Sequence, residues 1–437
     1  MTLAGIVVGA GVGVALGTTV VRSIRDSRRH ARVFERTQRL GHTEPVSLHP
    51  RINLDVCINS GGCVTSCPEK DVLGMVDGRP HLIKPSACIG HGECLRACPV
   101  DAITLVIGTE KRGVELPLLG TDFQTNVPGL FIAGELGGMG LIHNAVNQGA
   151  QSRRAIHTSL SGKAPEGVYD VVIVGAGPAG LSAALQAKEL GLSFVVLEQE
   201  QLGGALRSFP RQKVVMTAPV QMPIYGKVQL RRTTKEALLE LWQEIVLKTE
   251  LEIVEGVKVG DIKQENDLFV VETSKGERRA RRVLLAIGRR GTPRKLGVPG
   301  EQLEKVTYKL IEPEQYRGQK CLVVGGGDAA VETALMLAKE PGTQVTIDHR
   351  GDKFDRCKPD NFEALQKAEI AGTLSVMVSA KPLEIADDHV VLEARRKEKL
   401  PNDFVFVCIG GELPTAWLSK IGVEVKTLKG EAFPAAQ

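Results

Sequence analysis

The sequence predicts an α/β fold with two similar strand–helix–strand domains, preceded by a small cysteine-rich α+β domain and one apolar N-terminal helix. Three observations support this prediction. From residue 168 onward the chain twice follows the order strand, glycine loop, helix, strand, which is typical of parallel sheets with crossover helices. Six of the nine cysteines lie between Cys57 and Cys98. Residues 2–21 carry no charge, and such a run is long enough for a helix that spans a bilayer.

The length of 437 residues suggests about three domains. A hydrophobic content of 43% and a charged content of 24% are ordinary for globular proteins, which excludes a mainly disordered or collagen-like chain. The net charge of +4 is concentrated, because residues 22–39 hold seven arginines and only two acidic residues. Nucleic-acid-binding proteins usually spread basic charge over a folded surface. We therefore expect no nucleic-acid partner and interpret this region as a basic arm beside a membrane.

The apolar run over residues 1–21 is expected to be a retained transmembrane helix. A cleaved signal peptide would carry basic residues before the run, and none stands there. Residues 7–11 look like a glycine-rich nucleotide loop, but arginine-rich sequence without a second strand follows them. By the positive-inside rule, the arginines place the rest of the chain on the cytoplasmic side. The expected location is the cytoplasmic membrane, crossed once, with the catalytic part facing the cytoplasm.

Four glycines recur at every fourth position of this run. On a helix they form one stripe that lets a second membrane helix approach closely. We expect the stripe to pair with a second copy of the chain or with another membrane protein. The glycines are Gly5, Gly9, Gly13 and Gly17.

Residues 51–107 contain two copies of one cysteine pattern. Bacterial ferredoxins hold two iron–sulfur clusters with the run C-x2-C-x2-C-x3-C-P, in which the fourth cysteine serves the other cluster. The block resembles such a ferredoxin, and the resemblance implies two clusters. A disulfide scaffold is disfavoured, because it would be a small secreted protein. In the crossed arrangement, one cluster takes Cys57, Cys63 and Cys98, and the other takes Cys88, Cys94 and Cys67.

Both copies lack the second cysteine of the ferredoxin pattern, and Ser60 and His91 stand there instead. Three thiolates can hold a [3Fe-4S] cluster, or the Ser60 oxygen or the His91 nitrogen can complete a [4Fe-4S] cluster. A degenerate block without clusters is disfavoured, because six thiols keep matched spacing. A zinc site is a weaker alternative.

The first strand–helix domain carries a glycine loop of the form G-x-G-x-x-G, followed by a helix and a strand that ends in an acid. The glycines let a pyrophosphate approach the helix N-terminus, and the acid accepts a hydrogen bond from a ribose hydroxyl. Strand, loop, helix, strand and acid together predict a dinucleotide-binding site. Its expected residues are Gly175, Gly177, Pro178, Ala179, Gly180 and Glu198.

The second strand–helix domain repeats this design and ends its second strand at Asp348. That acid suits the free ribose hydroxyl of NAD, whereas the arginines that follow it suit the 2′-phosphate of NADP. We favour NADP(H) and leave NAD(H) open. The expected residues are Gly325, Gly327, Asp328, Ala330, His349, Arg350 and Arg356.

Apolar strands that end in glycine lie on both sides of the second dinucleotide unit, over residues 284–288 and 406–410. With them, the chain resembles the two-dinucleotide flavoproteins of the thioredoxin reductase-like superfamily over residues 168–428. The resemblance implies two Rossmann-like dinucleotide-binding domains, of which the first binds FAD and the second binds NAD(P)H.

That family closes its FAD domain with a late segment of the type T-x-V-P-G-L-F-A-A-G-D. In this chain the segment stands upstream, over residues 125–135, before the first glycine loop. The order therefore resembles a circular permutation, which is tolerated when the original termini lie close together on the surface. The resemblance implies that Gly134 and Glu135 contact the ribityl or phosphate region of FAD. It also implies that the turn ending at Gly140 faces the flavin ring.

Two departures from the family concern cysteine. Thioredoxin reductases carry a C-x-x-C pair in the NADPH domain, and this chain has none. The bacillithiol disulfide reductase-like branch has a cysteine in its flavin glycine loop, where Ala179 stands here. Thiol–disulfide chemistry therefore lacks both of its known nucleophile positions.

We predict a membrane-anchored NAD(P)H-dependent FAD oxidoreductase that passes electrons between nicotinamide, FAD and its own clusters. The partner that gives or receives them is expected to be a quinone, a cytochrome or another redox protein. No catalytic acid–base residue is expected, because hydride transfer depends mainly on stacked ring geometry. One alternative is a disulfide or small-molecule reductase with accessory clusters. The other is a non-enzymatic membrane redox sensor or assembly subunit.

The expected domain boundaries follow from these features. They are a transmembrane helix (1–21), a basic juxtamembrane linker (22–50), a ferredoxin-like iron–sulfur domain (51–107), a permuted FAD-closing segment (108–163), an FAD-binding domain (164–290), an NAD(P)H-binding domain (291–410) and a return to the FAD domain (411–437).

Overall fold

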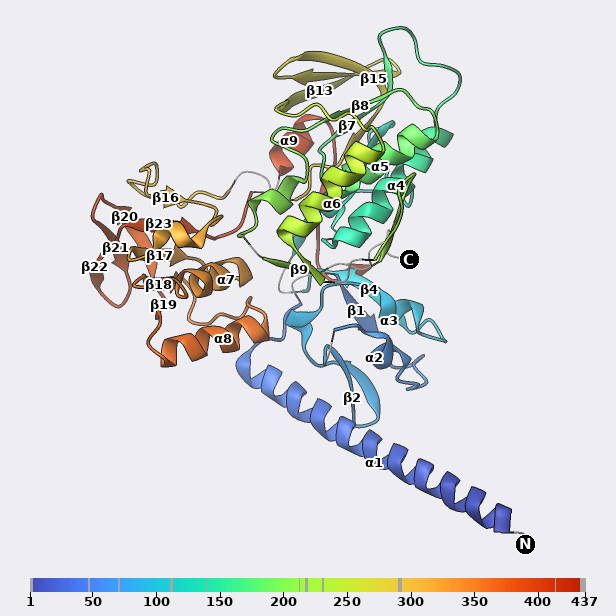
Figure 1. Ribbon diagram of the computed structural model, residues 1–437, viewed down its shortest axis with the longest axis vertical. Helices are drawn as coiled ribbons and strands as arrows, with labels where there is room; N and C mark the ends of the chain where they lie inside the picture. Colours follow the sequence, from blue (N-terminus) through green and yellow to red (C-terminus); the bar gives the residue numbers. More distant parts are fainter. Residues whose placement is uncertain are drawn as a thin grey trace. The chain divides into compact units, whose positions relative to one another are not determined.

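In the computed structural model, the chain divides into two compact units (Figure 1). The first consists of Met1–Lys111 and Gly430–Gln437, and the second of Arg112–Lys429. Each unit has sheets of its own. The structure describes residues 3–45, 48–69, 71–110, 113–138, 140–211, 213–216, 219–229, 232–289, 293–412 and 414–432.

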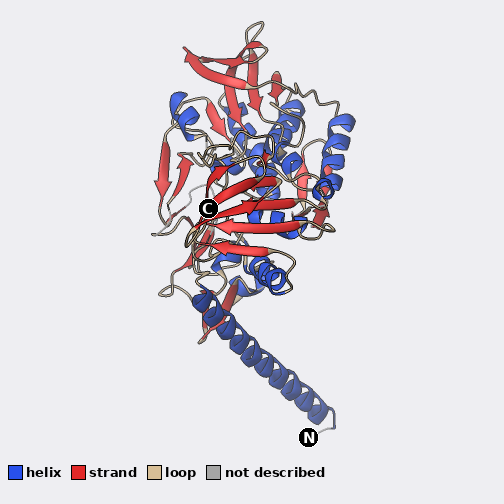
Figure 2. Ribbon diagram, turned by 90° about the vertical axis from the view of Figure 1, so that its left-hand side faces the viewer, coloured by secondary structure: helices blue, strands red, loops and turns tan. Residues whose placement is uncertain are grey.

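The first unit combines a long helix with two small sheets. Its elements are α1 (Leu3–Leu40), β1 (His49–Ile52), α2 (Gly62–Ser66), β2 (Leu73–Val76), β3 (Arg79–Leu82), η1 (Pro85–Ala87), α3 (Glu93–Arg96), β4 (Ile103–Ile107) and β25 (Glu431–Ala432). Helix α1 is continuous in both views (Figure 2). The strands β1, β4 and β25 form an antiparallel sheet, while β2 and β3 form a hairpin. The two short helices, α2 and α3, each belong to one cysteine repeat.

The C-terminal part of α1 packs against the β2–β3 hairpin. His30 is buried, and its Nδ1 accepts a hydrogen bond from the backbone N–H of Met75 at 3.1 Å. Arg29 forms an ion pair with Asp71 at 3.1 Å. The segment expected to be a linker is therefore helical as far as Leu40, because its inward side chains have a folded partner.

The expected membrane anchor over residues 1–21 finds no support. Within the described ranges, no helix is long and apolar enough to cross a bilayer. The side chains of residues 1–17, and with them the expected glycine stripe, lie outside the part of the chain that is described.

The main sheet of the second unit has six strands. They are β6 (Leu130–Ile132), β7 (Tyr169–Val174), β8 (Phe194–Leu197), β13 (Val259–Glu265), β14 (Leu268–Thr273) and β15 (Gly276–Leu285). Their order is β13-β14-β15-β7-β8, and β6 also pairs with β15. The pairing of β6 with β15 is parallel, and all three residues of β6 are buried. A segment upstream of the first glycine loop therefore belongs to the sheet of that loop.

Three helices pack around this sheet, namely α4 (Ile142–Thr158), α5 (Pro178–Glu189) and α6 (Lys235–Lys248). Helices α4 and α5 lie side by side (Figure 1). A Cβ atom at Gly149 in α4 would lie 2.1 Å from the carbonyl oxygen of Ala179 in α5, so this close approach requires glycine. Helix α6 begins after Thr234, whose hydroxyl accepts a hydrogen bond from the N–H of Ala237.

Short elements complete this part of the unit. They are β5 (Val114–Pro117), η2 (Glu135–Gly137), η3 (Gly204–Ser208), β9 (Val214–Met216), β10 (Val220–Met222), β11 (Gly226–Val228), β12 (Arg232–Thr234), α9 (Thr415–Lys420) and β24 (Val425–Leu428). Strand β24 pairs with β5, and Leu418 of α9 shares a core with Leu130 and Ile132 of β6. The chain after residue 411 thus returns to the first sheet, but its last strand, β25, joins the other unit.

The second sheet is parallel and has five strands. They are β16 (Val306–Thr307), β17 (Lys320–Val324), β18 (Gln344–His349), β19 (Ser375–Val378) and β23 (Phe404–Val407), in the order β16-β23-β17-β18-β19. The accompanying elements are η4 (Pro313–Tyr316), α7 (Asp328–Leu337), α8 (Pro359–Ile370), β20 (Lys381–Ile385), β21 (His389–Glu393) and β22 (Lys397–Pro401). The two strand–glycine loop–helix–strand units expected from the sequence are thus both present.

Candidate cofactor sites

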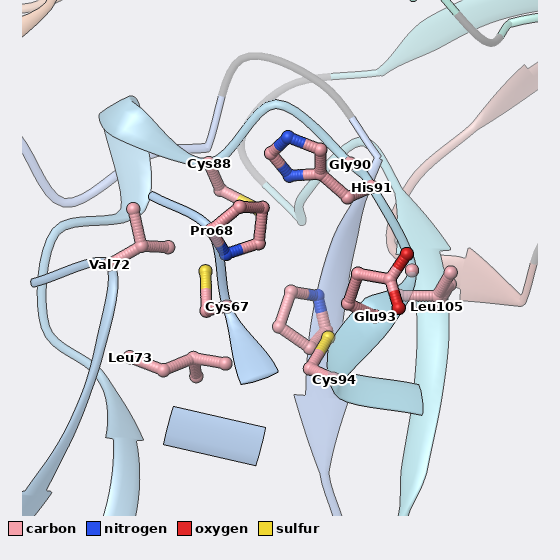
Figure 3. Close-up of a pocket in the computed structure, with 12 residues that line it drawn as sticks. Cys67, Pro68, Val72, Leu73, Cys88, Gly90, His91, Glu93, Cys94 and Leu105 are labelled. Atoms are coloured by element: carbon pink, nitrogen blue, oxygen red, sulfur yellow. The ribbon is translucent and has the colours of Figure 1, made fainter. Parts of the chain in front are cut away.

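One group of cysteines lines a small hollow in the first unit. Cys67 follows α2, Cys88 follows η1 and Cys94 lies in α3. Figure 3 shows the three side chains directed toward the same space, with His91 beside them. These three cysteines are the set that the crossed ferredoxin arrangement assigns to one cluster.

A second hollow is lined by the other three cysteines, Cys57, Cys63 and Cys98, together with Ser60. The two cysteine repeats thus exchange their last cysteine, since the short helix inside each repeat, α2 or α3, lies just before that cysteine, which lines the other hollow. Each hollow contains three thiols and one replacement residue, as the sequence pattern predicts.

Two of the buried thiols are protonated in the absence of a metal ion, and a protonated thiol is a poor metal ligand. Burial raises the pKa of Cys88 to about 12 and that of Cys94 to about 11, and the neighbouring cysteines add to both shifts. Cations such as iron favour the thiolate and reverse this shift. Among the described side chains, no three His, Cys, Asp or Glu residues converge as ligands of a single ion. A cluster does not require such convergence, because each cysteine binds a different iron atom.

The first glycine loop is shaped to hold a phosphate group. Gly175 has φ 105°, and a Cβ atom there would lie 2.6 Å from the carbonyl oxygen of Ala286. A Cβ atom at Gly180 would lie 1.9 Å from the carbonyl oxygen of Gly175. Beside Gly177, by contrast, a Cβ atom would meet nothing within 4 Å. The loop is therefore compact on its inner side and open on its outer side, at the start of α5.

The acid after the second strand lies beside this loop. Glu198 is 5% exposed, and its Oε2 accepts a hydrogen bond from the N–H of Ala176 at 2.8 Å. Its Oε1 accepts another from Glu200 at 2.9 Å. The carboxylate is thus held at the loop, where a ribose is expected.

The upstream segment meets the same loop. A Cβ atom at Gly134, which has φ 87°, would lie 3.0 Å from the Cβ of Ala179. Glu135 begins the turn η2, and a Cβ atom at Gly140 would lie 3.5 Å from its Oε1. Gln148, which the sequence analysis did not identify, is buried in α4 and accepts a hydrogen bond from the N–H of Gly134 at 2.8 Å. Helix α4 is rich in polar residues, so no local sequence pattern distinguishes Gln148 from its neighbours.

The second glycine loop repeats the geometry of the first. A Cβ atom at Gly325 would lie 2.5 Å from the carbonyl oxygen of Cys408, and Gly327 is open like Gly177. Ala330 replaces the third glycine and lies against Gly325. The side chain of Asp328 stabilises the chain before and within α8, because its Oδ1 accepts hydrogen bonds from the Lys358 N–H and the Asn361 amide.

The residues after β18 divide between the interior and the surface. Asp348 is 1% exposed, and its Oδ1 has no hydrogen-bond partner among the described groups. Burial raises the pKa of this carboxyl to about 8. The ring of His349 lies against Gly326 and against the ring of Phe354, with ring centroids 5.1 Å apart. Arg350 and Arg356 are exposed.

The three remaining cysteines form no disulfide bond. Cys321 lies in β17, Cys408 follows β23 and Cys357 precedes α8. Burial raises the pKa of Cys321 to about 12 and that of Cys408 to about 11. The pKa of Cys357 is also raised by burial, and its Sγ lies 3.6 Å from Oδ1 of Asp328. None of these three thiols is disposed to act as a thiolate nucleophile.

Two glycine loops, each between a pair of parallel strands, together with two groups of three thiols, define a flavin- and nicotinamide-dependent oxidoreductase with an iron–sulfur domain. Residues 172–434 match the family described as pyridine nucleotide-disulphide oxidoreductase, and the chain belongs to this family. Residues 49–99 match the 4Fe-4S dicluster domain. The cofactors are therefore FAD, NAD(P)H and two iron–sulfur clusters.

The chain is similar to several proteins that are reductases by name. The chain is 31% identical over 273 residues to bacilliredoxin reductase of Bacillus subtilis, covering 60% of this chain and 83% of the relative. It is 35% identical over 265 residues to ferredoxin–NADP reductase of Ignicoccus hospitalis, covering 59% and 82%. Among solved structures, bacillithiol disulfide reductase from Bacillus cereus aligns with a TM-score of 0.54 at 25% identity, covering 59% of this chain and 82% of that one.

These similarities confirm the expected flavoprotein oxidoreductase with an iron–sulfur domain and its relation to thioredoxin reductases. They support a reductase of the type of these relatives, which was the first alternative of the sequence analysis, more directly than a relay through the chain's own clusters.

Proposed function

We propose that this protein is an NAD(P)H-dependent reductase whose FAD exchanges electrons with the two clusters of the same chain, and that a separate redox partner is the final donor or acceptor. The observation that carries the proposal is the grouping of six thiols around two hollows in a chain with two dinucleotide loops. FAD, when bound, takes a hydride from a nicotinamide and can release electrons singly, which is what an iron–sulfur cluster accepts.

Disulfide reduction is the second candidate, because one relative is a bacilliredoxin reductase. That chemistry requires a thiolate pair or a reactive thiol near the flavin. Outside the two hollows, the described cysteines are Cys321, Cys357 and Cys408, and the pKa of each is raised by burial. Their placement favours electron transfer through the clusters over disulfide reduction.

The test is anaerobic purification of the full chain, with iron and sulfide counted, followed by titration with NADPH. The proposal expects two clusters per chain and the bleaching of their absorbance by NADPH at a rate faster than turnover. A yellow protein without iron, or clusters that NADPH does not reduce and that NADP+ does not reoxidise after their reduction with dithionite, would exclude the relay. Reduction of a low-molecular-weight disulfide at a comparable rate would favour the second candidate.

For the nicotinamide we infer NADP(H). The carboxylate of Asp348, which would suit the free ribose of NAD, is buried and has a pKa of about 8, so it is largely protonated at neutral pH. It therefore adds little repulsion against a 2′-phosphate. Arg350 and Arg356 lie exposed beyond the same strand and supply the positive charge.

Replacing Arg350 with alanine is expected to raise the KM for NADPH by about 10- to 100-fold and to leave NADH unchanged, since a charge-assisted contact contributes about 1.5–3 kcal/mol. Stopped-flow reduction of bound FAD by each nucleotide measures this. The exposed Lys353 on the same loop is the control, as Lys353→Ala. Equal losses for both nucleotides in Arg350→Ala would contradict the assignment.

The preference for NADPH should also fall as pH rises through about 8, because ionised Asp348 repels the 2′-phosphate.

The partner-binding surface is proposed to be the basic face of α1. With about 100° between successive residues, the seven arginines fall within an arc of about 120°, on the side opposite the buried His30. All seven are exposed. They are Arg22, Arg25, Arg28, Arg29, Arg32, Arg36 and Arg39. Helix α1 packs on the hairpin whose Leu73 lines the first hollow, so this basic face belongs to the same compact unit as the clusters. Its positive charge favours an acidic electron carrier as the partner.

Reversing three charges of this face, as Arg25→Glu, Arg28→Glu and Arg32→Glu together, should raise the KM for an acidic ferredoxin about 10-fold or more at low salt. The effect should shrink at high salt because exposed charges are screened. Steady-state NADPH oxidation measures it, and Arg279→Glu, Arg395→Glu and Lys397→Glu together make a control with the same charge change. An unchanged KM contradicts the carrier, and loss of binding to anionic lipid vesicles alone would indicate a membrane surface as the partner.

A further inference from the structure

The two cysteine repeats differ at the position of the missing cysteine, which is Ser60 in one and His91 in the other. Each of these residues lines the hollow of its own repeat. In both repeats the residues on either side have left-handed backbone conformations, so the same loop shape presents the replacement residue to the hollow. The flanking residues are Asn59, Gly61, Gly90 and Gly92.

The loop around His91 is held firmly. Arg96 donates a hydrogen bond from Nη2 to the His91 carbonyl oxygen at 3.2 Å. A Cβ atom at Gly90 would lie 2.9 Å from the carbonyl oxygen of Leu48, so the loop lies close against a neighbouring segment. Figure 3 shows the imidazole ring extending from this loop over the hollow, on the side of Cys88. The ring therefore has little freedom to leave the hollow.

The carboxylate of Glu69 lies near the His91 ring. Nε2 of His91 lies 3.9 Å from Oε1 of Glu69. Metal-binding histidines are commonly oriented by a carboxylate at the ring nitrogen that does not bind the metal. Nε2 is the ring nitrogen on the side of Glu69, and Nδ1 is the one on the side of the hollow (Figure 3).

Ser60 offers no comparable ligand. Its Oγ accepts a hydrogen bond from the N–H of Gly62, two residues along its own loop, at 3.5 Å. A serine side chain is shorter than a histidine side chain, and its hydroxyl is neutral at physiological pH. The two hollows therefore differ in their donor sets although their loops are alike.

We propose that His91 is the fourth protein ligand of the cluster held by Cys67, Cys88 and Cys94, whereas the cluster held by Cys57, Cys63 and Cys98 has three. This inference rests on the proposed function only in requiring that both hollows contain clusters. Because a neutral imidazole replaces a thiolate, the potential of the first cluster is higher than that of an all-cysteine equivalent. The two clusters of the chain are thus unequal, and the one with His91 is the four-iron cluster.

The test is pulsed EPR on the reduced full chain, reconstituted anaerobically with ¹⁵N-labelled histidine. A histidine nitrogen coupled to one cluster is expected in the wild type and in Ser60→Ala and His81→Ala, and it should vanish in His91→Ala and His91→Cys. His91→Cys should retain a four-iron cluster with a lower midpoint potential, and His91→Ala should give a second three-iron signal on oxidation.

The labelled wild type decides the question even if a variant fails to fold. Clusters that NADPH reduces but that carry no histidine coupling would overturn the ligand assignment and leave the proposed function intact. A coupling that persists in His91→Ala would also overturn it. A chain that binds no iron would overturn both.

Discussion

Gly180→Ala is expected to weaken FAD binding by about 10- to 100-fold. A Cβ atom at Gly180 would lie 1.9 Å from the carbonyl oxygen of Gly175 and 3.0 Å from its carbon. These are backbone atoms of the glycine loop, so no side-chain rotation relieves the clash, and the loop must move away from the start of α5. Overpacking of this kind costs about 1–3 kcal/mol. If the clash raises the free energy of the FAD-binding conformation of the loop by this amount, the affinity for FAD drops by about 10- to 100-fold.

The measurement is the FAD-to-protein ratio after desalting, together with a titration of the apoprotein with FAD. Gly260→Ala is the control, because the nearest atom to its Cβ lies 3.8 Å away and the residue is far from the loop. The iron content of Gly180→Ala should equal that of the wild type, since the cysteines belong to the other compact unit. Full retention of FAD would show that the loop relaxes without losing its phosphate-binding shape.

The sequence was sufficient for the sites whose residues are close together in the chain. The two glycine loops and the two cysteine repeats are short patterns with fixed spacing, and the crossed grouping of the cysteines follows from the spacing rule of ferredoxins. The structure adds that Gly175 and Gly325 meet equivalent carbonyl groups, those of Ala286 and Cys408. These contacts join residues more than 80 positions apart, so a local pattern cannot reveal them.

The roles of single polar residues were harder to predict. Asp328 and Asp348 both stand at positions typical of nucleotide contacts, yet one bonds to the Lys358 segment and the other is buried. Gln148 was missed because its contact with Gly134 depends on how α4 packs, which no short pattern encodes. The residues up to Leu40 were likewise expected to be a linker, because no short pattern shows that His30 packs on the hairpin and bonds to the N–H of Met75.

The second large effect concerns the cysteines of the clusters. Replacing Cys63 or Cys94 with alanine removes one of three thiols from a hollow, and neither hollow contains a spare cysteine among its lining residues. Loss of a direct ligand should lower the affinity for the cluster by more than the 10- to 100-fold that outer-shell changes cost. We therefore expect about 100-fold or slower NADPH-dependent reduction of an acidic ferredoxin. Reduction of ferricyanide, which can react with the flavin directly, should remain within about twofold.

The contrast between the two acceptors separates the proposed relay from a reductase with accessory clusters. In the relay, electrons reach the carrier only through the clusters, so both alanine variants fail with ferredoxin and succeed with ferricyanide. If the clusters are accessory, reduction of the natural acceptor survives both substitutions. Cys321→Ala is the matched control, because this thiol is buried in β17, outside both hollows, and its loss should change neither activity. Because Cys63 lines one hollow and Cys94 lines the other, Cys63→Ala and Cys94→Ala should each deplete one cluster and spare the other. Iron counts near half of the wild-type value would therefore support two independent clusters, while complete iron loss from either variant would mean that the domain folds around both together.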